Sequence, residues 1–140
     1  AHLTAAVWHW NVYYHTAIQA AMDCNGDASQ FVSKMGGPAY YGGLKENFVD
    51  VSPLNEKTVA PGTQDAIDQV RQMIVSGDWD VFTGTKLNIT VADGKATVEK
   101  VAADMLDNEG NKILAAGDPS VEDSVITGSM NYFVAGVQEA

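Results

Sequence analysis

The chain has 140 residues, 18 of them acidic and 8 basic, which gives a formal net charge of -10. This length suffices for one domain and is short for two, and the negative charge repels phosphate backbones and anionic lipid, so we expect no nucleic-acid binding. The single cysteine, Cys24, cannot form an internal disulfide, and no Cys or His set has metal-ligand spacing, so neither metal nor thiol chemistry is expected.

Aromatic residues crowd the first predicted element, where positions 7 to 14 are VWHWNVYY. Trp10, Tyr14 and Ile18 recur four residues apart, which places them on one helical face and predicts a helix over about residues 9–24. The turn formers in CNGDAS end this helix. The rings allow two interpretations: they fill a core, or they form a wall on which a flat ligand stacks.

Glycines punctuate the next segment, MGGPAYYGGLKENFVDVSPL, and separate short aromatic and β-branched stretches. We expect strands at residues 39–41 and 48–51. A second helix is predicted over about residues 62–76, because its apolar residues have helical spacing and Gly77 stands where a left-handed cap belongs. The sequence DWDVFTG, residues 78–84, predicts another short strand.

This order of helix, strand, helix and strand is what a parallel sheet with crossover helices produces, so the predicted fold class is α/β. Residues 85–116 differ, because LNITV alternates apolar and polar residues before an ADG turn and DNEGNKIL holds a second turn signal. We expect β-hairpin structure in this part of the chain. Near the carboxyl end, Asp118 is a predicted helix cap with Pro119 in the first turn.

No motif brings potential catalytic side chains together. The sequence has no G-x-S-x-G turn and no glycine-rich phosphate loop. His9 and His15 are six residues apart and fall on different sides of the predicted helix, so they do not form a metal-binding pair. The acidic residues are scattered as on a solvated surface. We therefore expect no enzyme activity, no catalytic residue, no metal and no cofactor.

Five segments together resemble the carboxyl-terminal part of the basic membrane protein family: AVWHWNVYY, AYYGGLKENFVDVSPLNEKTV, SGDWDVFTG, NEGNKILAAG and MNYFVAGV. Members of this family are bacterial solute-binding lipoproteins that deliver purine nucleosides or related compounds to ABC transporters. They have the type I periplasmic-binding-protein fold, in which two three-layer Rossmann-like lobes hold the ligand in the cleft between them. The resemblance implies that residues 1–140 are the carboxyl-terminal half of such a receptor, with the first lobe absent and an insertion at about residues 85–105.

The resemblance also implies partners and a location. The expected partners are a purine nucleobase or nucleoside, an ABC permease and the amino-terminal half of the same receptor. The expected location is the bacterial cell envelope outside the cytoplasm, in the periplasm or lipid-anchored to the membrane. No stretch approaches the ~18 apolar residues of a membrane span, and no signal segment opens the chain. A lone second half would leave apolar surface and strand edges uncovered, so self-association is expected.

One departure from the family bears on the ligand. In nucleoside receptors of the family, the segment that resembles LTAAVWHW carries a lysine that contacts the ribose, and here Trp8 stands at that position. Tryptophan offers a π face and a single N–H, which suits stacking on a free base better than binding several sugar hydroxyls. We therefore assign Trp8, His9 and Trp10 to the ligand site. Trp8 is expected to face the cleft, and Trp10 to lie mainly in the core with Tyr14.

Gly42 and Gly43 are expected to form a hinge or a crossing strand, because a residue without Cβ lets the chain bend or pass close to a neighbour. Two other functions remain as alternatives to a transport receptor. One is a metabolite-sensing regulatory domain of the same fold, which the genomic neighbourhood would distinguish. The other is a small α/β enzyme, which turnover of a purine would reveal.

Overall fold

The computed structural model describes residues 2–137 of the chain, and these form a mixed α/β structure of four α-helices, a short 3-10 helix and six strands. The chain divides into two compact units, Ala1–Val59 and Ala60–Ala140. This mixture of helices and strands agrees with the coarse α/β prediction, whereas the three-layer Rossmann-like lobe stays a prediction. Every strand ladder within the described residues is antiparallel and joins two strands, so this chain does not form the parallel sheet that the element order predicted.

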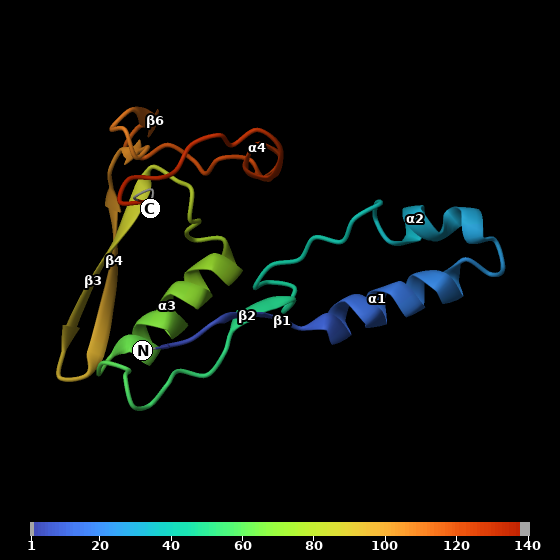
Figure 1. Ribbon diagram of the computed structural model, residues 1–140, viewed down its shortest axis with the longest axis horizontal. Helices are drawn as coiled ribbons and strands as arrows, with labels where there is room; N and C mark the ends of the chain where they lie inside the picture. Colours follow the sequence, from blue (N-terminus) through green and yellow to red (C-terminus); the bar gives the residue numbers. More distant parts are fainter. Residues whose placement is uncertain (1, 138–140) are drawn as a thin grey trace. The chain divides into compact units, whose positions relative to one another are not determined.

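The first unit is built on a long helix and a two-stranded ladder (Figure 1). Its elements are β1 (Ala6–Trp8), α1 (Trp10–Asp23), the 3-10 helix η1 (Ala28–Gln30), α2 (Phe31–Lys34) and β2 (Val49–Val51). The ladder pairs Ala6 with Val51 and Trp8 with Val49. Beyond it, the Ser52 amide donates to the Ala5 carbonyl at 2.8 Å and the Asn55 amide donates to the Leu3 carbonyl at 2.8 Å. The N-terminal segment is therefore held along the chain that follows β2.

Two of the three elements predicted in this unit are confirmed. Helix α1 lies within the expected range 9–24, with His9 and Cys24 as its caps, and β2 lies within the strand range expected at 48–51. The strand predicted at residues 39–41 was wrong, because this segment has no ladder partner. Instead, the Tyr40 ring lies edge-on to the ring of Phe48, with centroids 5.0 Å apart. Aromatic packing thus replaces the strand pairing that the sequence pattern suggested.

The second unit places a helix against a β-hairpin (Figure 1). Its elements are α3 (Thr63–Ser76), β3 (Thr85–Ala92), β4 (Lys95–Ala102), β5 (Met105–Leu106), β6 (Lys112–Leu114) and α4 (Asp123–Gly128). Helix α3 is fastened to the hairpin at one residue of β4, Ala96. The Ala96 amide donates to Asp65 Oδ2 at 2.7 Å, and Gln69 Nε2 donates to the Ala96 carbonyl at 2.9 Å. These bonds fix the helix across the strand.

The helix cap and the two turns predicted from the sequence of this unit are confirmed. Helix α3 matches the prediction and ends at Gly77, whose φ of 74° is the left-handed cap. The β3–β4 hairpin turns at Asp93 and Gly94, both with positive φ, as the ADG signal predicted. The second turn signal is confirmed as well, because it connects β5 to β6 and has a positive φ at Gly110.

Two predictions in the second unit were wrong. Residues 78–84 form bends rather than a strand, and the Trp79 indole N–H donates to the Thr85 carbonyl at 2.8 Å. Asp118 does not cap a helix, since α4 begins at Asp123. The Asp118 carboxylate instead accepts the Ala115 amide at 2.8 Å, and its backbone binds Gly84. Both segments satisfy their polar groups through loop contacts that cannot be seen in a sequence window.

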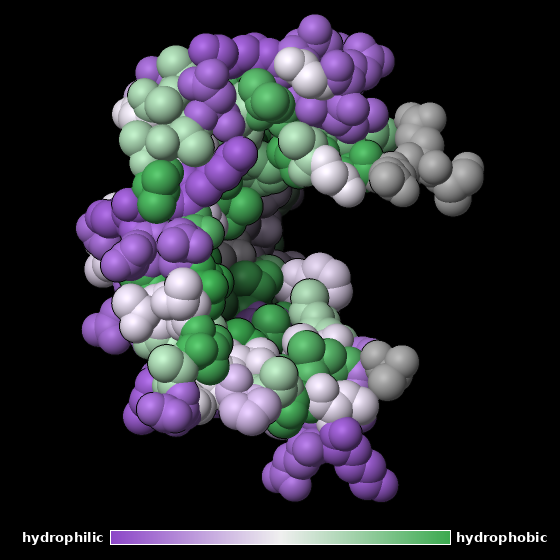
Figure 2. All heavy atoms as spheres, turned by 90° about the vertical axis from the view of Figure 1, so that its left-hand side faces the viewer, coloured by the Kyte–Doolittle hydropathy of each residue, from purple (hydrophilic) through white to green (hydrophobic). Residues whose placement is uncertain are grey.

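Few side chains of the described residues are buried, and none of them is completely shielded from solvent. The buried set consists of Ala20, Cys24 and Phe48 in the first unit and Ala96, Met105 and Asp107 in the second. Many large apolar residues are exposed instead, and Figure 2 shows hydrophobic residues at the surface beside hydrophilic ones. Apolar surface of this kind is typical of interaction surfaces. Uncovered apolar surface was the expected cause of self-association. Self-association itself stays a prediction.

Asp107 organises the turn between β5 and β6. Its carboxylate accepts the Asn111 side chain at 2.9 Å and the amides of Asn111 and Glu109 at 2.7 and 2.9 Å. The Asn111 side-chain bond is the main cause that holds the Asp107 pKa below its ordinary value, because these donors favour the charged carboxylate.

The lowered Asp107 pKa predicts acid sensitivity of this turn. A carboxyl with a depressed folded-state pKa stabilises the fold above its unfolded pKa of about 3.9 and loses this contribution as the pH falls through the folded value. Amide exchange of Glu109 and Asn111 should therefore accelerate below about pH 4 once intrinsic rates are subtracted. Asp107→Asn should show fast exchange already at neutral pH, with little further change in acid. If the Glu109 and Asn111 amides of the wild type stay protected from exchange well below about pH 4, the proposed role of the Asp107 carboxylate is contradicted.

Candidate functional site

An aromatic pocket in the first unit is the strongest candidate for a binding site. It has a volume of about 380 Å³ and is lined by Trp8, Trp10, Tyr13, Tyr40 and Phe48. This size falls in the range of about 300–1,000 Å³ that ligand pockets usually have. No charged side chain lines it. The side-chain polar groups that these residues contribute are two indole N–H groups and two tyrosine hydroxyls.

The backbone explains why these rings converge. Trp8 ends β1, and Trp10 begins α1 with Tyr13 one turn further along. Phe48 directly precedes β2, and the His9 amide donates to the Phe48 carbonyl at 2.7 Å. The junction of β1 and α1 is thus hydrogen-bonded to the segment that carries Phe48. Because the two segments are locked together here, the rings on both sides are held in reach of one another.

Four of the rings form a closed circuit of edge-to-face contacts. Trp10 contacts Tyr13 at 6.2 Å between centroids, and Tyr13 contacts Tyr40 at 5.7 Å. Tyr40 contacts Phe48 at 5.0 Å, and Phe48 returns to Trp10 at 5.9 Å. The angles between successive planes are 67° to 88°. Edge-to-face pairs are worth about 0.5–1.5 kcal/mol each beyond burial, so the circuit supports its own geometry.

Trp8 lies outside this circuit. Its ring centroid is 6.5 Å from that of Trp10 at an interplanar angle of 34°, the pair closest to parallel among the described aromatic contacts. The Trp8 side chain is 57% exposed, whereas Phe48 in the circuit is 8% exposed. Trp8 therefore presents an open π face beside the circuit, in which Phe48 is buried and Trp10 is half exposed. This arrangement agrees with the expectation that Trp8 is the stacking residue, a role that stays a prediction.

His9 does not line the pocket. Its ring Nδ1 lies 3.0 Å from the Asn47 carbonyl oxygen. A carbonyl only accepts, so Nδ1 carries the proton in this bond and Nε2 of the neutral ring remains an acceptor. With the bond from its own amide to Phe48, His9 ties residues 47 and 48 to the start of α1. The ligand contact expected for His9 from the sequence stays a prediction.

Gly42 and Gly43 have different surroundings. A Cβ built on Gly42 would lie 2.9 Å from the Phe48 Cβ and 3.2 Å from Tyr40 Cε1. Gly43 accepts the Phe48 amide at 3.0 Å and donates to Glu46 Oε2 at 2.8 Å, and a Cβ there would meet only Glu46 Oε2 at 3.5 Å. Gly42 is thus required by close packing against the pocket. The expected hinge role of both glycines stays a prediction.

Replacing Gly42 with Ala should disturb the aromatic circuit. The added methyl must displace Phe48 or Tyr40, and overpacking of this kind costs about 1–3 kcal/mol. We expect lower stability in urea unfolding and a reduced near-UV circular dichroism signal from the aromatic rings. Gly43→Ala is the matched control, because its Cβ meets an ordinary contact distance and should leave both signals nearly unchanged. Equal effects of the two substitutions would contradict this explanation.

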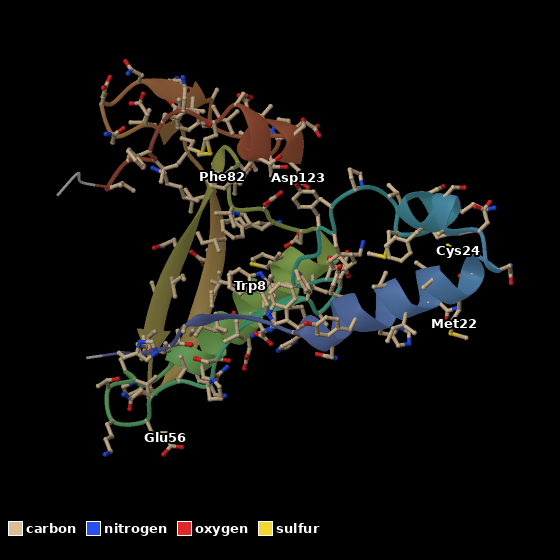
Figure 3. The ribbon with its side chains drawn as sticks, turned by 45° about the vertical axis from the view of Figure 1, so that its right-hand side comes forward. Trp8, Met22, Cys24, Glu56, Phe82 and Asp123 are labelled. Carbon is tan, nitrogen blue, oxygen red and sulfur yellow. The ribbon has the colours of Figure 1, made fainter. Side chains whose placement is uncertain are left out.

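The helical stripe predicted as core is not buried in the described residues. Trp10, Tyr14, Ile18 and Met22 are 53%, 58%, 63% and 67% exposed. The core interpretation of Trp10 and Tyr14 was therefore wrong for this chain, and Trp10 belongs to the pocket instead. Met22 and Cys24 lie at the end of α1 away from Trp8, so the exposed stripe runs along the helix from the pocket (Figure 3).

The pocket also contains three residues that were not expected at the site from the sequence, Tyr13, Tyr40 and Phe48. Tyr13 belonged to the quoted aromatic cluster, so its position one turn after Trp10 was an available signal. Tyr40 and Phe48 had been placed in strands, and only the path of residues 40–48 brings their rings to the β1–α1 junction. In the second unit, an apolar pocket of about 430 Å³ is bordered by Trp79 and Phe82, which are partly exposed rather than buried.

Within residues 2–137, no group of three or more His, Cys, Asp or Glu side chains is placed to hold a metal ion. None of the described helices combines the length and apolar character needed to cross a bilayer. Comparison with known proteins found no matching family model and no matching curated protein.

Proposed function

We propose that this chain belongs to a solute-binding receptor and holds a flat heteroaromatic ligand without negative charge, with a purine base as the favoured class. The observation that carries the proposal is the pocket lined entirely by Trp8, Trp10, Tyr13, Tyr40 and Phe48. Stacking of a base on an aromatic ring contributes on the order of 1–3 kcal/mol, so one open indole face is enough to matter for affinity.

Charge and polarity narrow the ligand class. A nucleotide would bring phosphate to a pocket that has no basic side chain, in a chain with a net charge of -10. A nucleoside would bring ribose hydroxyls to walls that are mostly π surface, and those hydroxyls would lose hydrogen bonds to water on entry. A free base loses the fewest hydrogen bonds on leaving water, because its faces stack and its edge can meet the tyrosine hydroxyls or indole N–H groups. These arguments favour base over nucleoside and nucleoside over nucleotide.

The receptor assignment rests on the resemblance to the basic membrane protein family. In this proposal the chain works outside the cytoplasm of a bacterium, contributes to a Rossmann-like lobe completed by the amino-terminal half of the receptor, and delivers its ligand to an ABC permease. The composition of the pocket favours binding over turnover, since two tyrosine hydroxyls are the only side-chain groups in its lining that can take part in acid–base or nucleophilic chemistry. We therefore propose a non-enzymatic role.

Isothermal titration calorimetry with adenine, adenosine and adenosine monophosphate tests the proposal. We expect saturable binding of adenine, weaker binding of adenosine and no binding of the nucleotide. Tyr41→Leu is the control variant, because Tyr41 neighbours Tyr40 in sequence but lies outside the pocket and is 77% exposed. Its affinity for adenine should equal that of the wild type. Tightest binding of the nucleotide, or no binding of any of the three, would refute the proposal.

A further inference from the structure

The negative faces of the pocket rings attract a positively charged ligand. An aromatic ring is negative over its face and positive at its edge. In the four-ring circuit, successive planes meet at 67° to 88°, so positive edges already lie against negative faces. Trp8 differs, because its one ring contact is tilted by only 34°. None of the other described rings meets Trp8 edge-to-face and Trp8 is 57% exposed, so its face is open to a positive group.

The pocket lining contains no positively charged side chain that would repel a cationic ligand. Residues 1–59 contain five acidic and three basic residues, so the surrounding unit is mildly acidic as well. No lining residue therefore opposes the attraction between the indole face and a cationic ligand by charge repulsion. A cation over such a face gains about 0.5–2 kcal/mol, which corresponds to about 2- to 30-fold in affinity.

The scarcity of polar groups points in the same direction. A neutral purine has several ring nitrogens that need hydrogen-bond partners, and unpaired ones lose affinity when they leave water. Alkylation of a ring nitrogen removes an acceptor and spreads a positive charge over the ring. Such a ring keeps its stacking face, needs fewer partners and gains attraction to Trp8.

We propose that the pocket prefers a flat heteroaromatic cation, of the N-alkylated ring class, over the uncharged ring of the same shape. This inference rests on the proposed function, because it specifies the charge of the flat ligand that the same pocket holds. Trp8 supplies the face for the charged ring, and the circuit of Trp10, Tyr13, Tyr40 and Phe48 supplies the apolar floor.

Calorimetry with two probes of matched shape tests the preference. N-methylquinolinium and its uncharged isostere lepidine, a methylquinoline, are titrated at mildly alkaline pH, where lepidine is neutral. Adenine is titrated in parallel as the probe of the proposed function. We expect N-methylquinolinium to bind about 2- to 30-fold more tightly than lepidine to the wild type. The same ratio is expected for the control variant Tyr41→Leu.

Trp8→Leu separates π attraction from apolar contact, because leucine keeps an apolar side chain without an aromatic face. The ratio of the two affinities should fall to about one in this variant. Equal or weaker binding of N-methylquinolinium by the wild type, with adenine still bound, would overturn the inference and leave the proposed function standing. Absence of binding by all three probes would overturn both. A preference for the cation that survives in Trp8→Leu would refute the role of Trp8.

Discussion

Gly84→Ala is expected to destabilise the Ala60–Ala140 unit by at least about 3 kcal/mol, the largest stability effect that we predict. Gly84 is buried, and a Cβ at this position would collide with the Ala115 carbonyl oxygen and lie 2.6 Å from the Asp118 amide nitrogen. Both obstacles are backbone atoms, which cannot swing aside as a side chain end can. The Gly84 carbonyl also accepts the amides of Ala103 and Gly117 at 3.0 and 2.7 Å. Relief of the collision must therefore break this hydrogen-bonded junction.

Urea unfolding followed by Trp79 fluorescence measures the loss, in a background where Trp8 and Trp10 are replaced with Phe so that the signal reports on this unit alone. Gly128→Ala is the matched control, because a Cβ there meets nothing within 4 Å and the residue ends α4 without a positive φ. This control should change stability by less than about 0.5 kcal/mol. A Gly84 variant as stable as the control would show that the strands and the loop at residues 115–118 are arranged differently.

Elements that depend on neighbours in sequence could be predicted from the sequence. Helix α3 has a helical stripe and a capping glycine, Gly77, and the hairpin has its turn signal at Asp93 and Gly94. Strands depend on a partner that is often distant in sequence, and two predicted strands failed for that reason. Residues 39–41 and 78–84 have the composition of strands, yet neither segment pairs in a ladder.

The site was partly predictable for a similar reason. The cluster that includes Trp8 and Trp10 is continuous in sequence, so its ligand role could be proposed before the structure. Tyr40 and Phe48 join it through the path of the loop between them, and Gly42 permits that path by its missing side chain. Burial was predicted poorly. Helical periodicity identifies the apolar face of α1, but it does not say whether any other part of the chain covers that face.

Replacing Trp8 with Ala should weaken adenine binding by about 1–3 kcal/mol, equivalent to about 5- to 150-fold in affinity, with only a small change in melting temperature. The stability loss should be small because Trp8 is 57% exposed and, among the described aromatic rings, contacts that of Trp10 alone. A buried tryptophan behaves in the opposite way, since truncation to Ala typically costs about 3–5 kcal/mol of folding free energy. Calorimetry and thermal melts on the same samples distinguish the two cases.

Trp79→Ala is the matched control for the loss of an indole. Trp79 belongs to the other unit, and its N–H donates to the Thr85 carbonyl at 2.8 Å. This variant should lose stability while its folded fraction keeps its affinity for adenine. Early melting of Trp8→Ala with unchanged affinity would instead mark Trp8 as a structural residue.

Trp8→Lys tests the origin of ligand choice. It restores the residue type that contacts the ribose in nucleoside receptors of the resembled family, and it replaces a π face with an ammonium group that donates to hydroxyls. We expect adenine to bind more weakly and the ratio of adenosine to adenine affinity to rise. Adenine, adenosine and guanosine titrated into wild type and Trp8→Lys give this ratio directly. An unchanged ratio would mean that the residue at position 8 does not select between base and nucleoside, and stacking on Trp8 would then have to be abandoned as the basis of specificity.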